Sequence, residues 1–166
     1  MRNAGCLLHA EGARLERGKE EAKGRDAALK QMNEDFQRIQ TLSFDLSDVF
    51  SSGNRPDYKK VSQDASDIRL RANRLKTNLV LPPSTKDEKH KKEQDADKTD
   101  LAALSSALSE SIKSFVGNPI FQRGSQHPAD GRDAARARLD LDEVIRLSAL
   151  ITKNADRLNK SPGSAN

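Results

Sequence analysis

Large aromatic side chains are scarce in this sequence of 166 residues, which has no Trp and 4% aromatic residues in total. A thick core built on large rings is therefore not expected. A narrow core of Leu, Ile, Val and Ala fits the composition better, and such cores are typical of helical bundles. Hydrophobic and charged residues are almost equally frequent, at 34% and 33%. The periodicity of the hydrophobic residues must therefore decide between a folded bundle and a disordered chain.

Cysteine and long apolar runs are also few or missing. The single cysteine, Cys6, excludes an internal disulfide framework and a zinc site with several cysteines. No apolar run approaches the roughly 18 residues that a membrane span needs. The first residues, MRNAGCLLHA, lack the apolar core of an export signal. We therefore expect a cytoplasmic protein as the chain stands, or one of the cell envelope or periplasm if its true start lies upstream.

The histidines do not form a recognisable metal site. His9, His90 and His127 lie in the first residues, in a charged run and in a loop, outside the hydrophobic stripes described below. Asp87 is the one acid that stands three residues before a histidine, whereas a di-iron bundle requires Glu-x-x-His on two helices. Cys6 has no neighbouring base that would activate it. We expect no metal, no cofactor and no enzymatic activity.

Four stripes of mostly apolar residues, spaced by three and four positions, predict four helices. The first begins at Ala28 and ends near Gly53; the second follows Pro56 and ends at Pro82. The packed part of the third begins near Leu101, and the fourth covers about 130–160. The stripes consist of Ala28, Met32, Asp35, Ile39, Leu42, Leu46 and Val49; Tyr58, Val61, Ala65, Ile68, Ala72, Leu75 and Leu79; Leu101, Leu104, Leu108, Ser111, Ile112 and Phe115; and Ala134, Ala137, Leu141, Val144, Ser148, Ile151, Ala155 and Leu158.

These stripes predict an all-α fold, an antiparallel up-down four-helix bundle over residues 28–160. A pair of helical hairpins that dimerise is the alternative, because the turns alone do not distinguish one chain from two. Residues 1–27 are expected to form a flexible or partly helical lead-in, and residues 161–166 a disordered tail. The charged run at 86–98 follows a capping-box pattern at 85–88 and is either a solvated helical extension or disordered.

The stretch DIRLRANRLK at 67–76 is rich in cations. On a helical wheel, Arg69, Arg71 and Lys76 flank the apolar seam, while Arg74 points outward. Residues 53–83 contain seven basic and three acidic residues, whereas residues 31–52 contain one basic and four acidic residues. We interpret the cations as flanks that pair with the acidic first helix. The alternative is weak binding of anions or nucleic acid through Arg71, Arg74 and the 86–98 run.

Asp35 is the one charged residue at a strict stripe position. Polar residues at such positions commonly fix the register of a coiled seam. In an up-down-up-down bundle, counting residues along the first and fourth helices from the same end places Asp35 opposite Ser148. We therefore expect this pair to set the register of these two helices. Otherwise Asp35 would turn outward to an arginine such as Arg146. With this role, Asp35→Leu should leave stability unchanged or raise it.

Ile120 and Phe121 are an apolar pair in the polar loop at 117–131. Either they fold back onto the core beside Phe115 or Phe50, or they form an exposed anchor for a partner. The function we expect is that of a non-enzymatic interaction or structural protein that acts by binding. Its partner would be a protein or a second copy of itself; nucleic acid is the less favoured partner.

Overall fold

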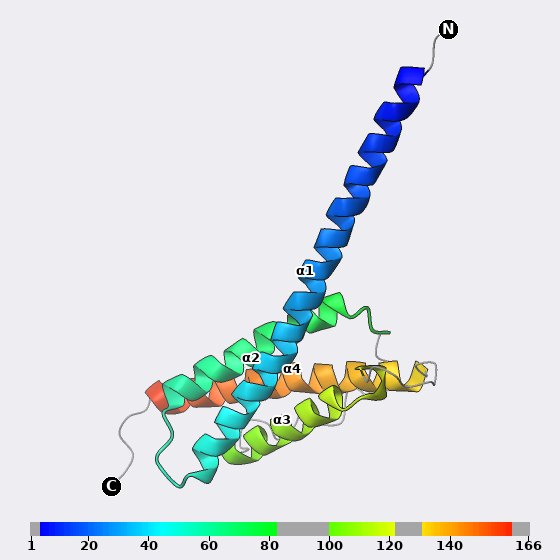
Figure 1. Cartoon of the computed structure of the whole chain (residues 1–166). Coiled ribbons are helices and arrows are strands. Elements are labelled where there is room, and N and C mark those ends of the chain that lie inside the picture. The colour runs from blue at the N-terminus through cyan, green and yellow to red at the C-terminus, as the bar shows by residue number, and fades with distance from the viewer. Residues whose placement is uncertain (1–3, 83–99, 122–130, 161–166) are drawn as a thin grey trace. The chain divides into compact units, whose positions relative to one another are not determined.

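A computed structural model describes residues 4–82, 100–121 and 131–160, with side chains from residue 20 onward. The chain divides into two compact units, Met1–Glu34 and Asp35–Asn166. Within the described residues there are four α-helices, α1 (Ala4–Ser51), α2 (Tyr58–Asn78), α3 (Leu101–Val116) and α4 (Gly131–Lys160), and the short 3-10 helix η2 (Pro119–Phe121) (Figure 1). The predicted all-α four-helix bundle is therefore confirmed.

The first unit contains the N-terminal part of α1. Residues 4–34 are helical, and residues 20–30 are all exposed. Residues 1–27 were predicted to be flexible or partly helical, and residues 4–27 are helical, so the first helix begins at Ala4 and not at Ala28. The segment contains no proline, and each glycine lowers helix stability by only about 1 kcal/mol relative to Ala. Extending a helix that already exists also avoids the unfavourable nucleation step.

The second unit contains the bundle, which is formed by residues 35–51 of α1 together with α2, α3 and α4. Helix α4 packs against both α2 and α3. Residues 35–51 of α1 contact α2 through Asp35 and Arg71, and α3 through Ser43 and Ser109. All four helices thus come from one chain, and α1 and α4 are each in contact with α2 and α3.

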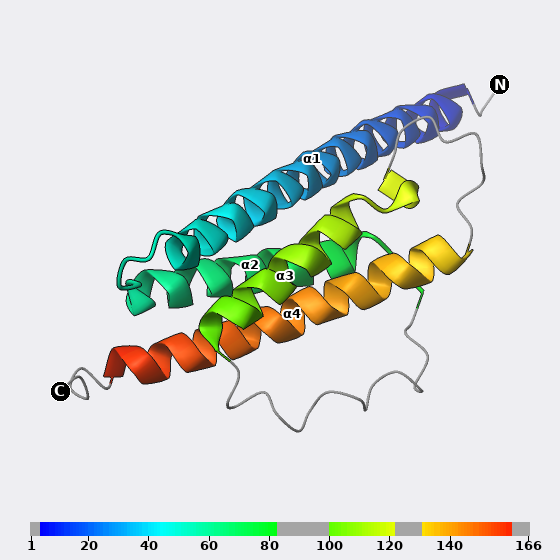
Figure 2. The ribbon, with the colours of Figure 1, turned by 90° about the horizontal axis from the view of Figure 1, so that it is seen from below.

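The contacts between helices also show their directions. Ser62 meets Asp156 and Lys76 meets Asp142, so α2 and α4 are antiparallel. Similar pairs show that α1 is antiparallel to α2 and to α3, and that α3 is antiparallel to α4. The contacting helices are therefore antiparallel, as predicted. However, α2 and α3 run in the same direction (Figure 2). The helices therefore do not strictly alternate in direction, as the predicted pairing of Asp35 with Ser148 assumed.

The boundaries of α2 follow from its local sequence. Gly53 lies two residues after the end of α1. It adopts a left-handed backbone conformation with φ of 69°, which glycine tolerates. The carboxylate of Asp57 then caps α2 by accepting hydrogen bonds from the backbone N–H groups of Lys59 and Lys60, at 3.0 and 3.2 Å. The helix ends at Asn78, before the predicted stop at Pro82.

The predicted stripes form most of the core. Some positions depart from this pattern: Ala28 and Leu158 are exposed, and the half-buried positions are Met32, Val49, Tyr58, Leu79, Ser111 and Ala134. The buried hydrophobic side chains are Ile39, Leu42, Leu46, Val61, Ala65, Ile68, Ala72, Leu75, Leu101, Leu104, Leu108, Ile112, Phe115, Ala137, Leu141, Val144, Leu147, Ile151 and Ala155. The core consequently contains one aromatic ring, Phe115, as the composition predicted.

Several expectations fall on parts that the structure does not describe. The capping box at 85–88, the run at 86–98, His90, His127 and the tail at 161–166 lie outside the described residues, and so do the side chains of Cys6 and His9. In the described part, no group of three or more His, Cys, Asp or Glu side chains is arranged to hold a metal ion. None of its helices combines the length and the apolar character that crossing a membrane requires.

Candidate functional site: the groove between helices α1 and α3

Asp35 is fully buried and binds two arginines of α2. Its Oδ1 lies 3.1 Å from Arg71 Nη1 and 2.5 Å from Arg74 Nη2, and its Oδ2 accepts a hydrogen bond from Arg74 Nε at 3.1 Å. A buried carboxylate is stable when charged hydrogen-bond donors compensate for its lost hydration. The side chains of Arg71 and Arg74 are 22% and 39% exposed, so both guanidinium groups remain in contact with solvent.

The expected pairing of Asp35 with Ser148 or Arg146 is therefore wrong. The Ser148 hydroxyl donates to the backbone carbonyl of Val144, one turn earlier in α4. Arg146 binds Glu143 at 2.6 and 2.8 Å, and this hydrogen bonding raises the pKa of Arg146. The pairing of Asp35 with Ser148 was predicted on the assumption that successive helices alternate in direction, and they do not. The helical wheel also predicted that Arg74 points outward, although a long arginine side chain can reach a neighbouring helix.

Most of the cations in the basic stretch pair with acids. Arg71 Nε also donates to Asp67 at 2.9 Å, and Arg38 of α1 lies 3.8 Å from the same carboxylate. Lys76 is 2.8 Å from Asp142 of α4. These pairs agree with the interpretation of the cations as flanks of the bundle, and they neutralise much of the positive charge that the alternative, anion binding, would use.

Three phenylalanines pack together at one end of the contact between α1 and α3. Phe36 stacks on Phe115 with a centroid distance of 5.2 Å, and Phe121 meets both rings edge-on at 5.0 Å. Ile120 and Phe121 are half-buried. Phe121 therefore folds back beside Phe115, one of its two expected neighbours, and its second ring partner is Phe36 rather than Phe50.

Asn118 positions the segment that carries Phe121. Its side chain is buried, donates to the backbone carbonyl of Asp133 in α4 at 2.9 Å, and accepts a hydrogen bond from the backbone N–H of Ile120 at 3.1 Å. The second bond is of the kind that Asn makes in tight turns. One side chain thus joins η2 to α4 and directs Phe121 toward α1 and α3.

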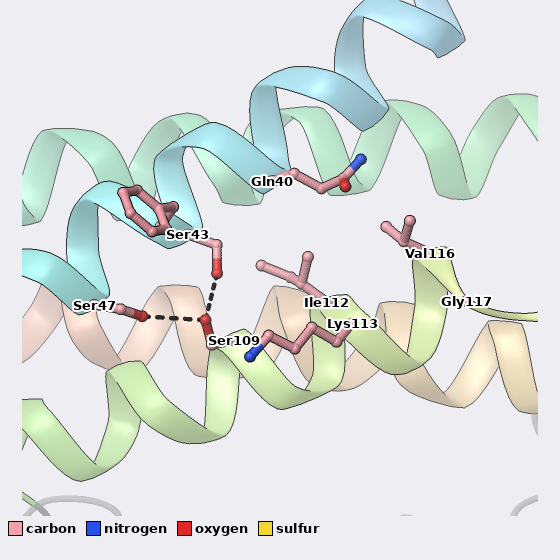
Figure 3. A pocket seen from close by; sticks show the side chains of 9 residues that line it. Gln40, Ser43, Ser47, Ser109, Ile112, Lys113, Val116 and Gly117 are labelled. Carbon is pink, nitrogen blue, oxygen red and sulfur yellow. Dashed lines mark hydrogen bonds between the residues drawn. The ribbon is translucent and has the colours of Figure 1, made fainter.

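Beyond the aromatic cluster, a groove of about 590 Å³ lies between α1 and α3. Volumes of this size are typical of sites that bind small molecules. Figure 3 shows the hydroxyl groups of Ser43 and Ser47 on α1 directed toward Ser109 on α3, at 2.8 and 3.1 Å. The residues that line the groove are Gln40, Ser43, Phe44, Ser47, Ser109, Ile112, Lys113, Val116 and Gly117.

Phe44 is the most unusual residue of this groove. Its side chain is 72% exposed, although large aromatic side chains usually bury most of their surface. The sequence reasoning missed Phe44 and the serines because it followed the buried stripes. A signal was nevertheless present: in a chain with so few aromatic residues, Phe44 stands outside the predicted stripe of its helix.

The lining of the groove suits noncovalent binding. It combines apolar surface from Phe44, Ile112 and Val116 with hydroxyl and amide groups, and it contains one charged residue, Lys113. None of the described residues that line the groove is an acid, a histidine or a cysteine, so these residues offer no set of metal ligands. The arrangement can hold an apolar group, donate or accept hydrogen bonds and attract a negative charge.

Comparison with known proteins adds no further constraint. Searches against protein-family models, curated proteins and solved structures found no match to this chain.

Proposed function

We propose that this protein is a non-enzymatic helical-bundle protein that binds a segment of a partner protein in the groove between α1 and α3. The observation that carries this proposal is the 72% exposure of Phe44 beside a groove of about 590 Å³. Exposed aromatic side chains at the edge of a pocket are a common feature of protein interaction sites, where they supply much of the binding free energy.

The neighbouring contacts support a preformed groove. The hydroxyl contacts of Ser109 join α3 to α1 at the site, and the stack of Phe36 on Phe115 joins the same helices at the aromatic cluster. A groove whose two walls are held together in this way loses little conformational freedom when a ligand binds. The proposal therefore expects binding without large rearrangement of the bundle.

Selection of a random peptide library displayed on phage tests this proposal. The library is selected on the wild-type protein, and the recovered peptides are measured on Phe44→Ser and on Leu70→Ser. Leu70 is a matched control because it is an exposed apolar residue, at 58%, that belongs to α2 and does not line the groove. We expect peptides that bind wild type and Leu70→Ser equally and lose at least about tenfold in affinity on Phe44→Ser. Failure to recover any peptide that depends on Phe44 would contradict the proposal.

A further inference from the structure

The chain itself shows how an aromatic side chain is accepted between α1 and α3. Phe121, supplied by the short segment η2, meets Phe36 of α1 and Phe115 of α3 edge-on at 5.0 Å. Phe44 lies eight residues after Phe36, which is about 12 Å along the helix and about 80° around it, so the two side chains point in different directions. Phe36 is half-buried, whereas Phe44 is 72% exposed.

Both positions lie beside α3. At the first, an α1 aromatic faces Phe115; at the second, an α1 aromatic lines a groove together with Ile112 and Val116 of α3. Gly117, at the C-terminal end of α3, lines the groove and stands two residues before η2. The groove therefore lies next to the segment that carries Phe121. An aromatic ring of a bound ligand would pack on Phe44 as Phe121 packs on Phe36.

The charge of the groove indicates which chemical group of the ligand lies next to its aromatic ring. Among the described residues that line the groove, Lys113 is the one that is charged. Glu110, an exposed acid, stands three residues before it on the same helix but does not line the groove. The Lys113 side chain is exposed, and Figure 3 shows it on α3, on the side of the groove opposite Ser43 and Ser47. A groove whose one charged lining residue is a cation favours ligands that carry a negative group.

From these observations we propose that the segment bound in the groove carries an aromatic side chain close to a carboxylate. The ring packs on Phe44, Ile112 and Val116, and the carboxylate of an Asp or Glu pairs with Lys113. This inference rests on the proposed function and identifies the chemistry of the partner segment. It assigns Lys113 the role of a specificity residue and Phe44 that of the main contact.

The test uses the phage-selected peptides and three variants, Lys113→Gln, Lys113→Glu and Phe44→Ser. Lys113 lies in the last turn of α3, where a cation stabilises a helix, so circular dichroism must first show that each variant is folded. We expect most peptides that depend on Phe44 to contain an aromatic residue with Asp or Glu within about one helical turn. Their affinity should fall about two- to fivefold on Lys113→Gln and further on Lys113→Glu. Selection on Lys113→Glu should instead recover peptides with Lys or Arg beside the ring.

The outcomes separate this inference from the proposed function. Peptides that depend on Phe44, but show no enrichment of acids and no response to Lys113→Glu, would overturn the inference and leave the proposed function standing. Absence of any peptide that depends on Phe44 would overturn both. Sedimentation provides a second test: a dimer of the wild-type protein that dissociates in Phe44→Ser would show that a second copy occupies the groove, and this would also overturn the inference.

Discussion

Helix α1 contacts its two neighbours in the bundle by different means. Toward α2 it presents Asp35, which two long arginine side chains reach from the next helix. Toward α3 it presents Ser43 and Ser47, whose short side chains meet another short side chain, Ser109. The arginines fill the space between the helices and leave Asp35 with no exposed surface. The serines span the contact but do not fill it, and the groove remains beside them.

This difference shows how side-chain length determines where a helical bundle is closed and where it stays open. Long side chains that cross the space between two helices fill it, whereas short side chains that touch at one point leave the space beside them open. The contact with α2 should consequently contribute mainly to stability, whereas the contact with α3 leaves surface available for binding. Three substitutions test this comparison.

The largest effect is expected from Asp35→Ala. The substitution removes the carboxylate that compensates Arg71 and Arg74, and breaking such a buried cluster costs about 3–5 kcal/mol. Because both guanidinium groups are partly exposed, we expect the lower end of this range, about 3 kcal/mol, from urea denaturation. The same contacts change the expectation for Asp35→Leu, which should also destabilise the fold. Asp48→Ala is the matched control, since Asp48 is an exposed acid on the same helix, and should change stability by less than about 0.5 kcal/mol. Equal effects of the two alanine variants would contradict the role of Asp35.

A smaller effect is expected from Ser109→Ala. The substitution removes both hydroxyl contacts between α3 and α1, at 2.8 and 3.1 Å. Ser43 and Ser47 can then donate to carbonyl groups of their own helix, so the loss should be about 0.5–1 kcal/mol in the same denaturation experiment. A loss as large as that of Asp35→Ala would show that the hydroxyl contacts hold the bundle together as strongly as the charged cluster does.

The smallest effect on stability is expected from Phe44→Ser. Because the side chain is 72% exposed, its removal should change the free energy of unfolding by less than about 0.5 kcal/mol. Phe36→Ala is the contrasting variant, because Phe36 packs against two other rings, and it should lower stability by up to about 3 kcal/mol. If Phe44→Ser were as destabilising as Phe36→Ala, Phe44 would be part of the folded core and not a binding surface.

The sequence predicted the fold class and most of the core because both depend on a repeating local geometry. The seven-residue spacing of Ile39, Leu42 and Leu46 places these side chains on one face of a helix wherever that helix lies, and all three are buried. Likewise, Asp57 can cap α2 with the N–H groups two and three residues later. Neither inference requires knowledge of the neighbouring helices.

The candidate site was less predictable. Phe44 was identifiable as an aromatic residue outside the buried stripe, but the groove beside it also depends on Ser109, Ile112 and Val116 of another helix. The partner of Asp35 was missed because the order of helix directions was assumed. The position of Phe121 was predicted in part, since the hydrophobicity of the side chain favoured burial but did not identify Phe36 as a neighbour.

The sequence by itself therefore determined that there are four helices, about where each lies, and which face of most of them is hidden from water, because hydrogen bonding and side-chain spacing within a helix are local. Only the tertiary structure decided that α2 and α3 run in the same direction, that Arg71 and Arg74 meet Asp35, and that an open groove adjoins Phe44. These features depend on how far each side chain reaches across the gap to a helix that is distant in the sequence. That distance is fixed by the packing of the whole bundle.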